Sequence, residues 1–342
     1  MILISFVIPA FNSESYLHKA VESLLSASKD IEIIIINDGS IDRTKDIAEY
    51  YAKLYPNTVI ALHKENGGHG SAINKGIEAA HGKYIKIIDS DDWVDESSLH
   101  QLLYQMKVNE ERKFDIDLYL TNFVYEHVSD NTEYERDYSS NFPQGEVFTW
   151  HETKKRFKYS KTLLMHALVY KTQIFKDIHF ELPEHTFYVD NLVAYIPLPY
   201  VKHLYYMKLP FYRYFIGRSD QSITLKNITN RYLQQIRVQK IMIDAYSYEQ
   251  INSFPSGLRF YMKHCVSAIM MITQMFTVTQ DSSERRNHLK DLWHHIKKQD
   301  IKLYRFLRFR SMNFWVHNLP WRIKSYVMVK GYLYLVKKVK LG

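Results

Sequence analysis

Residues 83–93 have the sequence KYIKIIDSDDW. Short apolar runs rich in Ile are typical of buried strands, so residues 84–88 are predicted to form one. Three carboxylates, Asp89, Asp91 and Asp92, follow within four positions, and clustered like charges repel one another. Mg²⁺ or Mn²⁺ binds such oxygens together with substrate phosphates, which suits the carboxyl end of a strand. The alternative is a polar turn that closes the strand.

Strand-like and helix-like segments alternate over the first 95 residues. The strands are apolar throughout, which indicates a mostly parallel sheet covered by helices on both faces. The carboxyl ends of such strands form one edge, where ligands bind. The expected strands are residues 2–9, 31–36, 58–62 and 83–88, and the expected helices are residues 15–26, 42–54 and about 66–80.

Beyond the first 95 residues the pattern becomes mixed and then helical. A strand is expected at 114–125, a surface loop or hairpin at 129–146, and a helix at 189–197. Long helices with few glycines follow residue 230. The sequence therefore predicts an α/β domain of residues 1–225, with halves 1–95 and 96–225, followed by a helical C-terminal region of residues 226–342.

The composition is that of a globular protein. Of 342 residues, 46% are hydrophobic and 24% are charged, which provides for a core and argues against disorder. The single cysteine, Cys265, excludes an intramolecular disulfide, fits a reducing compartment and is expected to be a buried thiol. No signal-peptide pattern and no run of 18 apolar residues is found, so a cytoplasmic protein that does not span a membrane is expected.

The net charge of +8 lies entirely at the C-terminal end. Residues 301–342 contain ten Lys and Arg and no Asp or Glu, whereas the first 300 residues carry 35 basic and 37 acidic residues. Nine aromatic residues are interleaved with these cations. This pattern is typical of segments that lie on anionic membranes. Packing of the aromatics on the rest of the protein is the second interpretation, and nucleic-acid binding is disfavoured because no recognisable module accompanies the charge.

Three further segments carry candidate ligand-binding residues. FVIPAFNSE (residues 6–14) ends the first strand with Pro9, Asn12 and Glu14. IIINDGSIDRT (34–44) places Asp38 at the second strand's exit, where a carboxylate can accept from the N–H of a base such as uracil. Its alternative role is local, with Ser40 or Asp42 capping the next helix. ENGGHGSAINKGI (65–77) is a glycine-rich helix start that permits close approach of phosphate oxygens.

Together with GKYIKIIDSDDWV (82–94), these blocks resemble family-two glycosyltransferases of the A-type (GT-A) fold, which is Rossmann-like, in members that build bacterial cell-surface polysaccharides. The resemblance implies that residues 1–95 bind the nucleotide sugar and 96–225 face the acceptor. It also implies that Pro9, Asp38 and Asn66 contact the nucleotide. Asp89 and Asp91 match the family's metal-binding motif for Mn²⁺ or Mg²⁺, and Asp91 is the expected direct ligand. Asn12, Glu14 and Asn74 complete the expected donor-binding set.

One departure affects the donor site. Many family members have Arg before the second asparagine of the third block, whereas this chain has Ile73 before Asn74. One donor contact is therefore in doubt, and His69 and Lys75 are the candidates to replace it.

The resemblance also implies a general base 90–100 residues after the metal motif. Asp190, in FYVDNL (187–192), matches that position, and an ionised carboxylate can accept the proton of an attacking hydroxyl. Many relatives have Glu-Asp where this chain has Val189-Asp190, so Asp190 stands alone and Glu184 is the reserve candidate. The alternative role for Asp190 is a helix cap.

A later segment, YRYFIGRSDQSI (212–223), resembles the family's mobile donor-covering segment. The planar fork of Arg218 would suit phosphate oxygens, and Gln221 and Ser222 could add hydrogen bonds. A solvated loop arginine is the equal alternative.

These observations predict a metal-dependent, inverting hexosyl- or N-acetylhexosaminyltransferase. The donor would be a UDP-sugar and the acceptor a hydroxyl of a cell-surface glycan, a teichoic-acid-like polymer or a lipid-linked precursor. The enzyme would lie peripherally on the inner face of the membrane. A nucleotidyltransferase is the second hypothesis, although no basic glycine-rich loop follows the first strand. A catalytically silent membrane-surface protein is the third, and the presence of Asp89, Asp91 and Asp190 argues against it.

Overall fold

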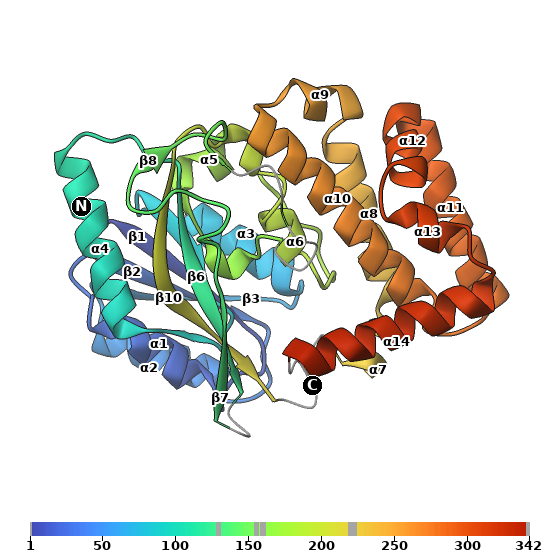
Figure 1. Ribbon diagram of the computed structural model, residues 1–342. Coiled ribbons are helices and arrows are strands. Elements are labelled where there is room, and N and C mark those ends of the chain that lie inside the picture. The colour runs from blue at the N-terminus through green and yellow to red at the C-terminus, as the bar shows by residue number, and fades with distance from the viewer. Residues whose placement is uncertain (1, 128–130, 154–156, 158–161, 218–223, 340–342) are drawn as a thin grey trace. The chain divides into compact units, whose positions relative to one another are not determined.

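The computed structural model describes residues 2–127, 131–153, 157, 162–217 and 224–339, the last five by their backbone alone. The chain divides into two compact units, Met1–Lys154 with Leu163–Phe215, and Lys155–Thr162 with Ile216–Gly342. In the first unit an α/β arrangement alternates strands and helices as far as α4 (Figure 1). Its elements are β1 Ile4–Ala10, α1 Leu17–Leu25, β2 Ile31–Asp38, α2 Thr44–Leu54, β3 Val59–Lys64, α3 His69–Ala79, β4 Tyr84–Ile87, β5 Trp93–Val94, α4 Glu96–Glu111, β6 Leu118–His127, β7 Thr132–Arg136, β8 Val147–Phe148, η2 Met165–Ala167, β9 Leu168–Lys171, α5 Thr172–Asp177, α6 Asp190–Val193, η3 Leu198–Tyr200 and β10 Leu204–Ile216.

One half of the sheet is parallel, in the order β3-β2-β1-β4. Every residue of β1, β2 and β4 is buried, as expected for strands covered on both faces. Because Ala10 pairs with Asn37, and Asp38 with Lys64, the exits of β1, β2 and β3 lie together. The predicted strands and their shared edge are confirmed.

The other half of the sheet contains antiparallel pairs, so the whole sheet is mixed. β9 lies antiparallel between β4 and β6, and β10 follows β6 in the strand order. β5, directly after the carboxylate-rich loop, pairs antiparallel with β10 through Tyr212 and Val94. This pairing brings a strand from residues 204–216 beside the end of β4.

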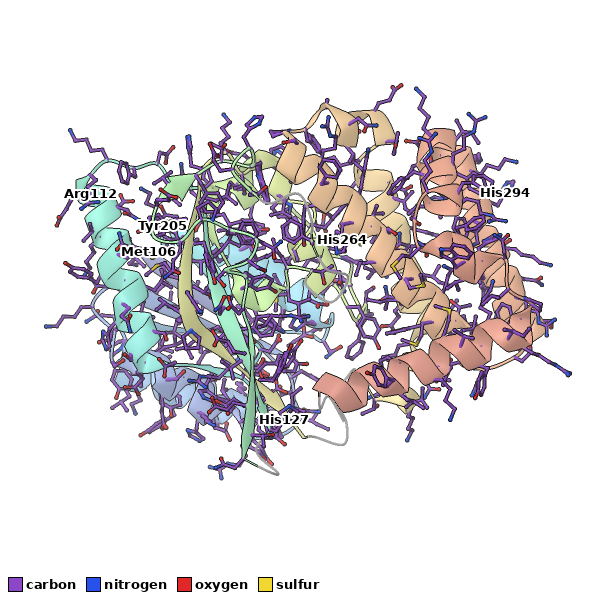
Figure 2. The ribbon with its side chains drawn as sticks, viewed as in Figure 1. Met106, Arg112, His127, Tyr205, His264 and His294 are labelled. Atoms are coloured by element: carbon purple, nitrogen blue, oxygen red, sulfur yellow. The ribbon has the colours of Figure 1, made fainter. Side chains whose placement is uncertain are left out.

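Two helical layers cover the sheet. α1 packs with α2 and α4, whereas α3 packs on β1 and β2 and against α5. Met106, on the inner side of α4, is completely buried (Figure 2). The predicted α/β class with helices on both faces is confirmed.

The second unit is helical. Its central helix is α10, which contacts α7, α8, α9, α11, α13 and α14 and carries the buried thiol of Cys265. Burial raises the pKa of Cys265 to about 12, so the thiol is a core group, as expected. His294 lies exposed on α11 (Figure 2). The elements are α7 Leu225–Asn230, α8 Tyr232–Ala245, α9 Tyr248–Ser253, α10 Ser256–Thr277, α11 Ser283–Gln299, α12 Ile301–Phe309, α13 Asn313–His317 and α14 Trp321–Val339.

One expectation about local structure needs correction. The helix expected at 189–197 is limited to Asp190–Val193 and a separate 3-10 turn, Leu198–Tyr200, because Pro197 lacks the N–H that a continuous helix requires. Within the polar stretch expected to be a loop or hairpin, β7 pairs antiparallel with β6, as a hairpin requires. The boundary expected at 225 falls at the first residue of α7, whereas the two units meet at 215 and 216.

The contact between α3 and β1 generates the first prediction. A Cβ added at Gly76 would lie 2.1 Å from Val7 Cγ1, whereas one added at Gly331 on α14 would meet nothing within 4 Å. Gly76→Ala should therefore lower the free energy of unfolding by about 1–3 kcal/mol through overpacking. Gly331→Ala should raise it by up to about 1 kcal/mol, because Ala favours a helix. Urea unfolding followed by circular dichroism measures both, and an unchanged Gly76→Ala protein would contradict the close packing.

Candidate active site

Hydrogen bonds join the loops after β1 and β2. The Asn12 side-chain oxygen accepts from the N–H of Ile41, and the Asn12 N–H donates to Ser40 Oγ, both at 3.0 Å. Glu14 Oε2 accepts from the N–H of Arg43 at 3.0 Å. Asn12 and Glu14 therefore shape the edge of the site through the neighbouring loop.

The first loop also contacts the loop after β4. Ser13 Oγ lies 2.7 Å from Ser90 Oγ. Pro9 lies buried in β1, paired with Ile36, and fixes the strand's exit. Asp42 Oδ1 accepts from the N–H of Thr44, the first residue of α2, at 3.0 Å. The residue before α2 is Arg43, which makes no side-chain cap, so Asp42 satisfies one N–H of the first turn without being the cap residue.

Asp38 holds the glycine-rich turn. Its Oδ1 accepts from the N–H of Gly67 at 3.0 Å and from Lys64 Nζ at 2.8 Å, and its Oδ2 accepts from the N–H of Gly68 at 2.8 Å. Asn66 Nδ2 donates to the Asp38 carbonyl at 2.9 Å. Two of the expected nucleotide contacts, Asp38 and Asn66, are thus directly linked to each other.

The glycine-rich turn in turn packs against the segment between α5 and α6. The His185 N–H donates to the Gly67 carbonyl at 2.7 Å. Gly68 has φ +85°, and a Cβ there would lie 3.0 Å from the His185 nitrogen. Glycine is therefore required at this position by both conformation and space.

Asn74 fastens the same segment. Its Nδ2 donates to the Leu182 carbonyl and its Oδ1 accepts from the Leu182 N–H, both at 2.9 Å. Glu184, the reserve base, is exposed and accepts from Ser71 Oγ at 2.9 Å. The amide of Asn74 is thus occupied by backbone, which assigns it a positioning role for residues 182–190.

Asp190 lies at the start of α6 but does not cap it. The residue before the helix is Val189, with no side-chain cap, and Asp190 is the first helical residue. Tyr188 has φ +66°, a conformation that costs a non-glycine residue energy and is concentrated at functional sites. The helix-cap alternative for Asp190 is therefore wrong.

Acidic groups from three parts of the chain meet around His69. His69 Nε2 lies 3.4 Å from Asp89 Oδ1. Burial lowers the pKa of His69, while the charges of Asp190, Asp91 and Asp38 oppose that shift. His69, the first residue of α3, therefore lies beside Asp89 and is influenced by the charges of the other carboxylates that the sequence singled out.

Burial and neighbouring charge raise the pKa values of two of these carboxyl groups. Burial, followed by the charge of Asp91, raises the pKa of Asp89 to about 7. Burial, followed by the charge of Asp89, raises the pKa of Asp190 to about 6, against the opposing effect of His69. Asp89 therefore interacts electrostatically both with Asp91, the expected direct metal ligand, and with Asp190, the expected base.

The carboxylate oxygens at this site suit a hard divalent cation that also binds the phosphates of a substrate. Within the described parts of the chain, no three His, Cys, Asp or Glu side chains gather to hold a metal by themselves. The two candidate carboxylates at the end of β4 are Asp89 and Asp91. Burial and then the charge of Asp91 raise the pKa of Asp89, and a bound divalent cation would lower it again. One or two carboxylates plus substrate phosphates is the usual Mg²⁺ set.

Tyr212 is a central residue that the sequence did not reveal. Its hydroxyl donates to Asp92 Oδ2 at 2.6 Å and accepts from the Asp89 N–H at 3.1 Å. Asp92 Oδ1 accepts from the Phe215 N–H at 2.7 Å. Asp92 is therefore not turned toward a ligand but ties the carboxylate-rich loop to β10. A tyrosine on a late strand gave no signal because its partners lie more than a hundred positions earlier.

Lys86 is the second unexpected residue. Its side chain is fully buried, and Nζ donates to the carbonyls of Met165, His166 and Leu168 at 3.0, 2.5 and 3.2 Å. Burial lowers the pKa of Lys86, and Asp89 and Asp92 oppose that shift. Its one sequence signal is a lysine within an otherwise apolar strand.

Some expected residues lie elsewhere or outside the description. Lys75 Nζ donates to Glu78 Oε2 at 2.9 Å on the exposed side of α3, so His69 is the better candidate to replace the missing arginine. Arg218, Gln221 and Ser222 lie outside the described residues.

Comparison with known proteins identifies similarity to glycosyltransferases. The family model for Glycosyl transferase family 2 matches residues 5–169. EpsH of Bacillus subtilis strain 168 is 30% identical over 248 residues, which is 68% of this chain and 64% of EpsH. The minor teichoic acid biosynthesis protein GgaB of the same organism is 37% identical over 117 residues, 33% of this chain and 13% of GgaB. The chain thus spans less than two thirds of the length of these relatives.

A solved structure shares the fold. The crystal structure of a fragment of S. aureus TarS in complex with UDP-GlcNAc has a TM-score of 0.60 and 16% identity, and the match covers 98% of this chain and 92% of that one. At this identity the likeness establishes the fold.

The second prediction tests the role of Tyr212. Tyr212→Phe leaves the buried Asp92 carboxyl without its hydroxyl donor, so the free energy of unfolding should fall by about 1–3 kcal/mol. The loop that carries Asp89 and Asp91 should also lose order, and Mn²⁺ affinity in the presence of UDP should fall. Urea unfolding and calorimetry measure the two effects. Tyr104→Phe, an exposed tyrosine on α4, should change neither, and equal behaviour of the two variants would remove Tyr212 from this role.

Proposed function

Because the chain belongs to glycosyltransferase family 2, we propose that it transfers a sugar from a UDP-sugar to an acceptor hydroxyl with inversion of the anomeric carbon. The supporting observation is that His69 lies 3.4 Å from Asp89, the proposed metal-binding carboxylate, and that the charges of Asp89 and His69 both act on Asp190, the proposed base. Asp89 follows directly after β4, and ligands of open α/β sheets bind at the carboxyl ends of the strands, which supports this assignment.

Asp190 is the proposed general base. As the acceptor oxygen bonds to the anomeric carbon, its proton passes to the Asp190 carboxylate, and the bond to the UDP oxygen breaks. A base is most effective when its pKa lies near the working pH, and the pKa of Asp190 is raised to about 6 by burial and by Asp89. Asn74 and the turn at 182–185 hold the segment that leads to it.

Asp89 and Asp91 are the proposed ligands of Mn²⁺ or Mg²⁺, with Asp91 the direct one. When bound, the ion would offset the negative charge that develops on the leaving diphosphate. His69 lies beside Asp89 and is placed to orient that carboxylate. Arg218, Gln221 and Ser222 stay predicted contacts of the diphosphate.

Asp38 and Asn66 are the proposed uracil-side residues, with Pro9, Asn12 and Glu14 shaping the rim. An ionised carboxylate offers about four acceptor positions, and donors of the described loop use three on Asp38. The fourth position, on Oδ2, is the proposed acceptor for the N–H of the base.

The proposed acceptor is a hydroxyl of a cell-surface glycan, a teichoic-acid-like polymer or a lipid-linked precursor, at the cytoplasmic face of the membrane. The likeness to GgaB supports this class, and the TarS complex with UDP-GlcNAc supports a hexosyl or N-acetylhexosaminyl donor. Among the described residues, no helix is both long and apolar enough to cross a bilayer. The basic residues of 301–342 support attachment to the membrane surface.

The third prediction concerns the metal. Asp91→Ala removes the direct ligand, so Mn²⁺-dependent turnover of a UDP-sugar should fall by at least about 10²-fold. Asp46→Ala, an exposed aspartate on α2, should keep wild-type turnover. Release of UDP with and without EDTA is the measurement, and full activity in EDTA would exclude a metal role for Asp89 and Asp91.

The fourth prediction concerns the base. Asp190→Asn keeps the size of the side chain but cannot take a proton, so turnover should fall by roughly 10² or more while UDP affinity is kept. In the wild type, kcat/KM should decline as pH falls through about 6, because protonation of Asp190 removes the base. The variant should lack this inflection. If UDP affinity collapses while turnover persists, Glu184 becomes the candidate, and Glu184→Gln is the matched comparison.

A further inference from the structure

Helix α14 buries a lysine and exposes apolar side chains, the reverse of a soluble helix. Lys324 is only 6% exposed, and Met328, one turn later, is buried beside it. Ser325 Oγ donates to the Val278 carbonyl at 2.7 Å and fastens this side of the helix. The opposite side exposes Ile323, Tyr326, Val327 and Tyr334, with Tyr326 66% exposed.

These exposed residues form one face. Positions 323, 326, 327, 330 and 334 follow the three- and four-residue spacing that places side chains together on a helix. Lys330, also exposed, lies at the centre of this series. An apolar face with a central cation suits the interface of an anionic lipid bilayer, where the hydrocarbon core is apolar and the headgroups are anionic.

A second apolar patch lies on α12 and α13. Phe309, Met312 and Trp315 are exposed, Trp315 to 74%. They line, with Arg310, one groove of about 520 Å³. We refer to these two exposed patches together as the docking face, whose residues are Phe309, Met312, Trp315, Ile323, Tyr326, Val327, Lys330 and Tyr334.

Two cations of this region bond to neutral groups. Arg308 Nη2 donates to Asn318 Oδ1 at 2.7 Å, and Lys324 Nζ donates to the His317 carbonyl at 3.2 Å, both neutral partners. Burial and then Arg308 lower the pKa of Lys324, which indicates that the two cations lie close together. Residues 301–342 themselves contain no carboxylate side chain, and among their described cations Lys302 forms an ion pair with Glu249 of α9.

We propose that the docking face binds the surface of an anionic lipid bilayer, with its aromatic side chains among the headgroups and its cations on lipid phosphates. The inference rests on the proposed function in one respect, the delivery of the enzyme to a membrane-bound acceptor. A second copy of the chain is a poorer occupant, because it would bring two cationic surfaces together. Anionic lipid instead complements the charge.

The test uses the full chain and sedimentation with two kinds of vesicle, phosphatidylcholine alone and a roughly 3:1 mixture with phosphatidylglycerol. The wild type should bind the mixed vesicles, and binding should weaken as salt rises because ions screen the attraction. Tyr326→Ser with Val327→Ser should lower binding about tenfold, since apolar area no longer enters the interface. Lys330→Gln should weaken binding and its salt dependence.

The matched control is Leu54→Ser with Tyr104→Ser, two exposed apolar residues of the first unit, which should bind as the wild type does. Equal binding to neutral and mixed vesicles, or equal loss in the control, would overturn the proposal. A dimer in sedimentation equilibrium that Tyr326→Ser dissociates would also overturn it, in favour of a second copy. UDP release in solution should be unchanged in every variant, so a failure of catalysis would be seen separately.

Discussion

The site depends on holding three carboxylates next to one another at the end of a buried strand. Their mutual repulsion and the loss of water both disfavour ionisation, and the pKa of Asp89 is raised to about 7 as a result. The protein stabilises this loop with the hydroxyl of Tyr212 and the N–H of Phe215, both directed at Asp92. The pairing of β5 with β10 supplies these donors, so the antiparallel half of the sheet maintains a site built on the parallel half.

On β4, before that loop, Lys86 donates hydrogen bonds to backbone carbonyl groups, and none of these partners is a carboxylate. Its three N–H groups are satisfied by carbonyls at the turn that leads into β9. The same turn places the ring of His166 parallel to Tyr212, with 4.6 Å between centroids. One buried cation therefore fixes the turn that supports Tyr212, which in turn orients the carboxylate-rich loop. Such a chain of contacts explains how a charge can persist in a core.

The loop contacts also explain how distant parts of the sequence assemble. Asp38 binds the backbone of the glycine-rich turn. The Gly67 carbonyl of this turn accepts a hydrogen bond from the segment at 182–185, and Asn74 on α3 binds the same segment. Asp190 then follows within one short helix. A displacement at any of these contacts would move the proposed base relative to Asp89, although none of the connecting residues needs to touch a substrate.

The sequence by itself determined the α/β class, the four parallel strands and the carboxylates at their shared edge, because apolar periodicity and strand-end chemistry are local properties. It also located the positive charge of residues 301–342, and the family resemblance singled out Asp190 as the candidate base. Only the tertiary structure decided that Asp92 binds Tyr212, that Asn74 holds Leu182, and that α14 buries Lys324 while exposing Tyr326. These outcomes depend on partners far apart in the chain, and the choice of buried helix face depends on what packs against it. Neither is encoded in the spacing of residues within one element.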